Sequence, residues 1–492
     1  EHLTTAEKIA EKSIVLLKND GLLPIRKDLR SVAVIGPAAD TVSYGDYTET
    51  RGRKGGVSVL DGIRAAVSPE TEVLYERGCN FLGQALHPFD PSMLRDENGE
   101  AGLTGRYYNG PVPQGEPVQV RTDRTVNFNW IFALPHPELD ANCFSVAWTG
   151  SVIMPKTMDG CIGLSTQDSM RLYVDDKLLI DGWGKDKSAD QALDFHFEAG
   201  RTYKIRIEFV NDRRGARVIF GYSAGWENFP AAVEAARKAD VAILCMGDNE
   251  ETSGENFDRT DLNLPGRQLE LVQAVYATGT PVVLVLQSGR PVTANWENDH
   301  LPAILEAWFP GEQGGTAIAK TLFGDAAPGG RLPITFPRSV GQIPCHYSRR
   351  PGGGKRYVEM DWLPLYPFGY GLTYTTFAYR DMALSRSVID PQDTVTVSVT
   401  VTNTGKYTGD AVPQLYVRDM FSSVVKPERQ LAAFRRLTLA PGESRRVELT
   451  VGPKQLRTLG PDYVWRVEPG KFELQLGDNA ENILLRADLT VE

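Results

Sequence analysis

GDNEETSGENFDRTDLNLPGRQ, residues 247–268, follows the short apolar run VAILCM at residues 241–246. Such a run predicts a fully buried strand of a parallel sheet. Apolar residues recur at helical spacing after Pro265, which predicts a helix beginning near that proline. A long polar loop therefore lies at the carboxyl end of a strand, where open α/β sheets place ligands and catalytic groups.

This loop is strongly acidic, with six carboxylate side chains set against Arg259. Composition alone favours a solvated acidic surface loop. The other interpretation assigns one carboxyl group to acid–base chemistry. An ion pair between Asp258 and Arg259 would shape the loop rather than take part in that chemistry. The six carboxylates are Asp248, Glu250, Glu251, Glu255, Asp258 and Asp261.

Apolar runs on both sides of this unit repeat its pattern. A stripe formed by Ile9, Ile14 and Leu17 predicts a helix over residues 7–17. Strands alternating with helices predict βα units in a layered α/β sandwich. The further predicted strands are 32–36, 72–78, 281–287 and 303–308, and the further predicted helices are 59–66, 229–239 and 316–324.

Two other regions show strand alternation without convincing helices. The first, residues 102–222, predicts a β-sandwich inserted into the α/β domain, because the α/β pattern resumes after it. The second begins at residue 377 and predicts a structural fibronectin type III-like sandwich, with Trp465 as a core or interdomain anchor. The fold class is multidomain α/β plus all-β. The predicted domains are the α/β sandwich at 1–95 and 226–337, the inserted β-sandwich at 96–225, a linker loop at 338–376 and the fibronectin type III-like domain at 377–492.

Charge and composition restrict the partners. The 492 residues carry a formal net charge of −10, which argues against nucleic acid or an anionic membrane as partner. No apolar run reaches the roughly 18 to 20 residues of a membrane span. The five cysteines form no CxxC and the six histidines no HExxH, so the sequence indicates neither a metal site nor a cofactor. The amino terminus lacks Met and signal-peptide character, so we expect that processing or truncation made this end.

Four long strings, in order along the chain, resemble signatures of glycoside hydrolase family 3. SGENFDR and DLNLPGRQLEL (253–259 and 261–271) resemble the family's acid/base loop, written as a Glu shortly before an aromatic residue, Asp and Arg. The most specific match is WFPGEQGGTAIAKTLFGDAAPGGRLPITFP at 308–337. AEKSIVLLKNDGLLPI at 10–25 and YPFGYGLTYTTFAY at 366–379 match two more. The resemblance implies only the carboxyl-terminal part of such an enzyme, since nothing here resembles the (β/α)8 barrel that precedes this region in the family.

The resemblance implies the chemistry of a retaining β-glycosidase, in which Glu255 aligns with the acid/base residue. Asn256 stands where many relatives have Gly, and Glu251 is the alternative proton donor. The nucleophilic Asp is expected on the barrel, supplied by another chain or by a missing part of this protein, so we expect the isolated chain to be inactive. The substrate would be a β-linked oligosaccharide or aryl glycoside, with β-glucosidase favoured over β-xylosidase. A stand-alone carbohydrate-binding scaffold is the alternative from another class, and a homo-oligomer is compatible with either.

The inserted region resembles the protective-antigen-type sugar-binding module, through GLTGRYYNG (102–110), RLYVDDKLLID (171–181) and EAGRTYKIRIEF (198–209). Its candidate sugar contacts are Asp168, Asp181 and Trp183, because sugars offer apolar faces to aromatic rings and hydroxyls to carboxylates. The pair at 175–176 could ligate calcium, but such a pair in a hairpin is more often turn chemistry. Tyr44, Asp46 and Tyr47 are weaker candidates, in a loop that approaches the sugar site in the resembling family; a turn with buried aromatics is at least as good an account.

Overall fold

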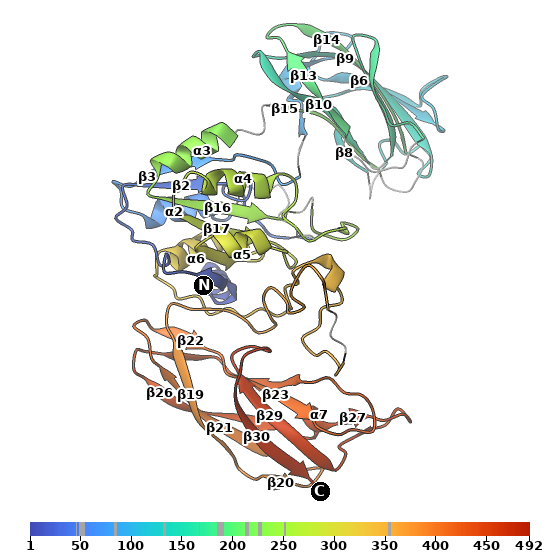
Figure 1. Cartoon of the computed structure of the whole chain (residues 1–492). Helices are drawn as coiled ribbons and strands as arrows, with labels where there is room; N and C mark the ends of the chain where they lie inside the picture. Colours follow the sequence, from blue (N-terminus) through green and yellow to red (C-terminus); the bar gives the residue numbers. More distant parts are fainter. Residues whose placement is uncertain are drawn as a thin grey trace. The chain divides into compact units, whose positions relative to one another are not determined.

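The computed structural model describes residues 1–45, 47–48, 55–82, 86–130, 134–166, 168–184, 191–211, 216–224, 229–249, 252–352 and 356–492. By their contacts these residues form two units (Figure 1). The first unit joins Glu1–Phe81 to Phe229–Glu492, and the second is Leu82–Asn228. The second unit is thus an insertion in the sequence of the first. Among the described residues, no helix has both the length and the apolar character needed to cross a membrane.

A six-stranded sheet forms the centre of the first unit. Its order is β1–β18–β17–β16–β2–β3, and every neighbouring pair is parallel except β1 with β18. The side chains of β2, β16, β17 and β18 are buried throughout, which explains why their sequences are continuous apolar runs. The strands are β1 (Val15–Asn19), β2 (Ser31–Ile35), β3 (Glu72–Glu76), β16 (Val241–Gly247), β17 (Val282–Gln287) and β18 (Ala303–Glu306).

Helices cover both faces of this sheet (Figure 1). Successive residues of β2 point to opposite faces, so Val32 and Val34 pack in one core with α1, α2 and α6, while Ala33 and Ile35 pack in the other with α3 and α4. This is the layered α/β sandwich that the sequence predicts. The helices are α1 (His2–Ser13), α2 (Val59–Ala66), α3 (Phe229–Lys238), α4 (Gln268–Tyr276), α5 (Asn295–His300) and α6 (Gly314–Leu322).

The prediction of one helix over residues 7–17 is wrong. Helix α1 ends at Ser13, and Val15 begins strand β1. Ile9 is 65% exposed, so it does not belong to a buried stripe. Ile14 and Leu17 instead contribute to opposite cores of the sheet, which is the period-two pattern of a strand.

The second unit is a β-sandwich of two antiparallel sheets. One sheet has the order β13–β10–β15–β4, with β8 also on β15, and the other β12–β11–β14–β9–β6–β7, with β5 also on β9. The unit begins at Leu82, upstream of the expected boundary at residue 96, because β4 pairs with β15 and β5 with β9. Its strands are β4 (His87–Pro88), β5 (Leu94–Arg95), β6 (Leu103–Asn109), β7 (Gln119–Asp123), β8 (Asn127–Asn129), β9 (Phe144–Ile153), β10 (Met158–Thr166), β11 (Ser169–Val174), β12 (Lys177–Asp181), β13 (Gln191–Phe197), β14 (Thr202–Asn211) and β15 (Arg217–Ala224).

The carboxyl-terminal part of the first unit is a second β-sandwich with an aliphatic core. Its main sheets are β19–β21–β26 and β20–β30–β29–β23–β24. Trp465 does not lie in this core: it is 54% exposed, on the small β27–β28 hairpin. The elements are β19 (Phe377–Leu384), β20 (Val388–Ile389), β21 (Val395–Asn403), β22 (Gly409–Ala411), β23 (Gln414–Asp419), β24 (Gln430–Phe434), β25 (Leu437–Leu439), β26 (Ser444–Val451), α7 (Pro453–Leu456), β27 (Thr458–Leu459), β28 (Trp465–Arg466), β29 (Gly470–Gly477) and β30 (Ile483–Val491). The predicted fold class, multidomain α/β plus all-β, is confirmed.

The linker segment, residues 338–376, crosses from the α/β sandwich to this second β-sandwich. It contains one 3-10 turn, Val340–Gln342, and isolated bridges join Phe336 to Tyr366 and Leu16 to Leu372. The backbone at its far end also contacts the second β-sandwich, where the Gln414 side chain donates to the carbonyl of Gly369 at 2.9 Å. The linker segment is therefore packed against both parts of the first unit.

Candidate functional site

The acidic loop begins where strand β16 comes closest to β17. Gly247, the last residue of β16, has φ +137°, and a Cβ there would lie 2.0 Å from the carbonyl oxygen of Gln287. Only glycine allows this approach. The buried amide of Gln268 at the start of α4 accepts from Gly247 N at 2.7 Å and donates to Gly247 O at 2.9 Å. The strand end and the following helix therefore hold both ends of the loop in place.

Asp248 is the first residue of the loop, and its carboxylate is buried at the loop's base. Thr252 Oγ1 donates to it at 2.9 Å, and the guanidinium groups of Arg259 and Arg290 lie 3.4 and 3.7 Å away. Burial raises the pKa of Asp248 above its usual range, although the Thr252 hydrogen bond and the two positive charges oppose that shift. The Asp248 carboxyl group thus holds Thr252, Arg259 and Arg290 together at the base of the loop.

The two arginines fasten the loop through backbone carbonyls. Arg290 donates to the carbonyl oxygens of Thr252 at 3.1 Å and Phe257 at 3.2 Å, on either side of Glu255. Arg259 donates to the carbonyl of Asn263 at 3.0 Å. Its described acidic partners are Asp248 and Asp261, not the predicted Asp258.

Glu255 lies between these fastened points, and its side chain is exposed. Asn256, the next residue, has φ +65°, a left-handed conformation that Asn tolerates better than most residues with a side chain. The loop thus presents a carboxyl group to solvent from a braced backbone. The alternative donor, Glu251, lies outside the described residues, as does Glu250.

A second buried carboxyl group lies at the same edge of the sheet. Glu306, at the end of β18, accepts from Trp308 N at 2.8 Å and from Ser288 Oγ at 3.1 Å. Burial raises the pKa of Glu306 to about 8, and the negative charge of Asp248 adds to this rise. The Glu306 carboxyl group therefore favours the neutral form at neutral pH, and it is buried in the protein interior.

Neighbouring loops meet the acidic loop at this edge. A Cβ on Gly45 or on Gly289 would lie within 3.2 Å of the Phe309 ring, so this ring packs against both backbones. Tyr44 donates to the carbonyl of Gly55 at 2.9 Å, while Tyr47 is 78% exposed with φ +57°. The structure thus places Tyr47 and Glu255 on loops at one sheet edge; Asp46 lies outside the described residues.

In the inserted sandwich, the predicted sugar contacts Asp181 and Trp183 lie at the end of β12, whereas the carboxylate of Asp168, just before β11, is buried. Arg171 donates to Asp181 at 3.1 Å, and its guanidinium lies 4.9 Å from the ring centre of Trp183. The hydroxyl of Ser169, next to the buried Asp168, accepts from Gly184 N at 3.1 Å, which ties the Trp183 loop to that end of β11. An aromatic ring, a guanidinium and a carboxylate side by side can bind a polyhydroxylated ligand.

The acidic pair Asp175 and Asp176 forms the β11–β12 turn. Both residues have positive φ, 49° and 59°, as a tight hairpin turn requires. Asp175 accepts from Lys204 N, and Asp176 pairs with the Lys204 ammonium at 2.8 Å. These carboxylates thus join the β11–β12 turn to Lys204 of the neighbouring strand β14. Across the described ranges, no three His, Cys, Asp or Glu side chains are placed to hold a metal ion.

Comparison with known families agrees with this geometry. The model of the glycosyl hydrolase family 3 C-terminal domain matches residues 14–374. The chain belongs to glycoside hydrolase family 3. A fibronectin type III-like domain model matches residues 411–480 of this family 3 chain.

Relatives of known name align over nearly the whole chain. A β-glucosidase of Rhizobium radiobacter is 34% identical over 98% of this chain and 62% of its own length. A β-xylosidase of Formosa agariphila is 45% identical over 59% of this chain and 42% of its own. The crystal structure of a β-glucosidase from Kluyveromyces marxianus in complex with glucose superposes with a TM-score of 0.77 and 28% identity, covering 99% of this chain and 62% of that one. The family 3 chain thus covers 62% of the length of the two β-glucosidases and 42% of that of the β-xylosidase.

Sequence reasoning missed the residues that brace the acidic loop in this family 3 chain. Arg290 and Glu306 were assigned no role, although a Glu inside the apolar run AILEAW is a signal that a buried carboxyl group was present. Arg171, which links Asp181 to Trp183, was missed as well. Arg290 carried no comparable signal, because its partners lie far away along the chain.

Proposed function

We propose that this chain is the carboxyl-terminal portion of a retaining β-glycosidase, a β-glucosidase, and that Glu255 is its proton donor. The supporting observation is the acidic loop itself. Asp248, Arg259 and Arg290 brace its backbone on both sides of Glu255, whose carboxyl group remains exposed at the carboxyl edge of a parallel sheet. A proton donor needs this combination of a fixed position and an accessible carboxyl group.

The second carboxyl group of the reaction would come from the barrel. Retaining glycosidases place two carboxyl groups roughly 5 to 5.5 Å apart, on opposite sides of the glycosidic bond. The ionised group attacks the anomeric carbon while the protonated one delivers H⁺ to the leaving oxygen; the donor, now a carboxylate, then deprotonates the water that releases the sugar. The 492 residues hold no counterpart of the family's nucleophile motif, so this chain alone is expected to be inactive.

The proposed substrate is a terminal non-reducing β-D-glucosyl residue of an oligosaccharide or aryl glycoside. The Rhizobium radiobacter and Kluyveromyces marxianus relatives, both named β-glucosidases, cover nearly the whole chain and support this choice. A β-xylosidase is the second candidate, favoured by the 45% identity to the Formosa agariphila protein. Assaying aryl β-glucoside and aryl β-xyloside side by side decides between them.

A stand-alone carbohydrate-binding scaffold is the candidate from another class. The cluster of Arg171, Asp181 and Trp183 in the inserted sandwich favours it, since it joins a carboxylate to an aromatic ring without any catalytic pair. Affinity for glucose or cello-oligosaccharides, together with no turnover after a family 3 barrel is supplied, would select this function.

The test of the enzyme proposal is to co-express the chain with a family 3 barrel and to assay an aryl β-glucoside. Glu255→Ala should lower kcat for a substrate with a poor leaving group about 10² to 10⁴-fold, as the loss of a general acid–base does. With an activated leaving group, azide should restore turnover and yield a β-glycosyl azide, because azide attacks the glycosyl–enzyme without needing a base.

Asp258→Ala is the matched control, since Asp258 is an exposed carboxylate of the same loop. It should retain most of the activity. If Glu255→Ala retains its activity while Glu251→Ala loses it, Glu251 is the donor. Turnover by the 492-residue chain alone would contradict the proposal that the nucleophile lies on the barrel.

A further inference from the structure

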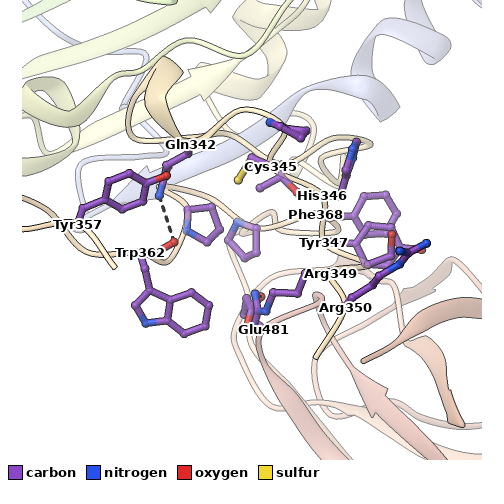
Figure 2. A pocket seen from close by; sticks show the side chains of 15 residues that line it. Gln342, Cys345, His346, Tyr347, Arg349, Arg350, Tyr357, Trp362, Phe368 and Glu481 are labelled. Atoms are coloured by element: carbon purple, nitrogen blue, oxygen red, sulfur yellow. Dashed lines mark hydrogen bonds and ion pairs between the residues drawn. The ribbon is translucent and has the colours of Figure 1, made fainter. Parts of the chain in front are cut away.

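A pocket of about 460 Å³ opens between the linker segment and the second β-sandwich, and no residue of the acidic loop lines it (Figure 2). Most of its lining residues lie between Thr335 and Arg350 and between Tyr357 and Phe368, and Glu481, from the β29–β30 connection, contributes the rest. Its volume lies within the range of about 300 to 1,000 Å³ that is usual for small-molecule sites. None of the predicted site residues lines this pocket.

Aromatic rings form much of its wall. Trp362 is 42% exposed, and Tyr357 lies near it with its hydroxyl donating to the carbonyl of Gly341 at 2.9 Å (Figure 2). Tyr347 stacks on Phe368 with ring centres 4.1 Å apart, and its hydroxyl accepts from Leu431 N at 3.1 Å. These contacts fix the rings in place, so little side-chain entropy would be lost when a ligand stacks on them.

Arg349 and Glu481 form a charged part of the wall. Arg349 donates to Glu481 at 2.7 Å and lies 3.3 Å from Glu428, and its guanidinium sits 4.6 Å from the ring centre of Trp362. The pair thus combines N–H donors with carboxylate acceptors and stands beside an aromatic face. Gln342 shapes the pocket rather than serving a ligand, because its amide already bonds the backbone of Arg338 and Trp362.

We propose that this pocket is a non-catalytic binding site for a neutral β-linked oligosaccharide. A sugar ring presents C–H bonds on its faces and hydroxyls around its rim. The faces would stack on Trp362, and the hydroxyls would both accept from Arg349 and donate to Glu481. Glu255 is not among the residues that line the pocket, so the proposal goes beyond the proposed hydrolysis and does not depend on it.

The mixture of groups in the wall selects this ligand class. A purely apolar ligand would strip water from the Arg349–Glu481 pair without replacing its hydrogen bonds, which carries a free-energy cost. An anionic ligand would have to compete with Glu481 and Glu428 for Arg349, which leaves Arg350 as the arginine of the wall with which it could pair. A neutral polyol satisfies donors and acceptors at once and leaves the ion pair intact.

The experiment is a saturation-transfer NMR titration of the 492-residue chain with cellobiose. All variants carry Trp183→Ala, which removes the candidate sugar contact of the inserted sandwich. Trp362→Ala in this background should weaken cellobiose binding about tenfold, the value of a lost stacking contact. Glu481→Gln should weaken it severalfold, since it removes the charge but keeps the shape of the side chain.

Trp465→Ala is the matched control. Trp465 is similarly exposed and also lies under an arginine, with Arg457 4.4 Å from its ring centre, but it is not part of the pocket. Its replacement should leave cellobiose binding unchanged. The proposal is overturned if Trp183→Ala alone abolishes binding, if binding persists undiminished with Trp362→Ala, or if both tryptophan replacements weaken it equally. Tighter binding of cellobiouronic acid than of cellobiose would likewise overturn the choice of a neutral ligand.

Discussion

The carboxyl edge of the α/β sheet and the carboxyl-terminal β-sandwich both bury carboxyl groups, but the pKa of Glu306 in the first is raised and that of Asp410 in the second is lowered. At the sheet edge, the carboxyl groups of Asp248 and Glu306 are buried. The Asp248 carboxylate accepts a hydrogen bond from Thr252, in the loop that Asp248 begins. In the β-sandwich, the core is aliphatic; the ion pair Arg386–Asp393 is exposed, while the side chains of the pair Lys426–Asp419 are largely buried. At the sheet edge, the buried Asp248 carboxyl group helps to fix the position of an exposed loop.

Asp410, a buried carboxyl group of the β-sandwich, differs from the two at the sheet edge in the direction of its pKa shift. Asp410 is buried too, but Thr438, Arg436 and Lys12 all bind it. Burial by itself would raise the pKa of Asp410, yet these three contacts outweigh it and lower the pKa. Asp248 and Glu306 at the sheet edge thus favour the neutral form, whereas Asp410 favours the charged form.

The largest predicted difference concerns two glycines with positive φ. Gly247→Ala should destabilise the sheet by about 4 kcal/mol, because strain at φ +137° adds to a clash with the Gln287 carbonyl. Gly442→Ala in the β-sandwich should cost only about 1 kcal/mol, since φ is +76° but the space around it is open. Hydrogen-exchange mass spectrometry, read separately for each domain, measures both values. Equal costs would show that the close approach of β16 to β17 is unimportant.

The next difference concerns two arginines. Arg290→Ala leaves the buried Asp248 with one positive partner fewer and removes two backbone contacts of the loop, so we expect a loss of about 3 kcal/mol. Arg386→Ala breaks an exposed pair and should cost less than about 1 kcal/mol. Urea unfolding of each variant tests the comparison, and exchange in peptides covering 252–263 should rise only in Arg290→Ala. Unchanged exchange there would mean that Arg290 does not hold the loop.

A third difference is the sign of the pH dependence. The pKa of Glu306 is raised from 4.5 to about 8, so its stabilising contribution is complete below pH 4.5 and is lost as the pH rises through 8. Glu306→Gln should remove this slope, which is at most about 1.4 kcal/mol per pH unit. Asp410 has a lowered pKa, so its contribution is present at neutral pH and is lost in acid; Asp410→Asn should therefore be most costly at neutral pH. Chemical denaturation from pH 9 down to acid well below pH 3.8 gives both slopes, and a shared sign would contradict the contrast.

The smallest effects are expected at exposed side chains of either region. Glu255→Ala and Trp465→Ala should each change the free energy of unfolding by no more than about 0.5 kcal/mol. Thermal unfolding of both variants beside the wild-type chain checks this. Such a result would mean that any loss of activity in Glu255→Ala reflects chemistry rather than folding, and a drop of several degrees in Tm would contradict it.

Strong local patterns predicted the fold well. Helix α2 covers Val59–Ala66 as the sequence predicted, and strand β16 differs from its predicted range only by Gly247. The residues Ile14 to Leu17 were misread, because a short apolar run fits a helix and a strand equally until the neighbouring strand is known. Trp465 was misplaced for a related reason: a large aromatic residue is usually buried, but this one lies on a short hairpin.

The candidate site was predictable only in part. The acidic residues after β16 could be found from the strand–loop–helix order, and the resemblance singled out Glu255. The bracing of that loop could not be predicted, because Arg290 follows another strand and meets Asp248 only once β16 and β17 are paired. Likewise, Trp362 and Glu481 come together only where the linker segment packs on the second β-sandwich.

The two ends of the insertion leave the α/β sandwich beside a single pair of residues. Gln268 donates to the carbonyl of Phe81 at 3.3 Å, and the neighbouring Arg267 lies over the ring of Phe229 at 4.8 Å. The gap left by removing residues 82–228 is therefore short enough for a few residues to bridge, and the entropy of closing so short a loop is small. Removal of residues 82–228 would thus leave the strand order of the sheet that precedes the Glu255 loop unchanged.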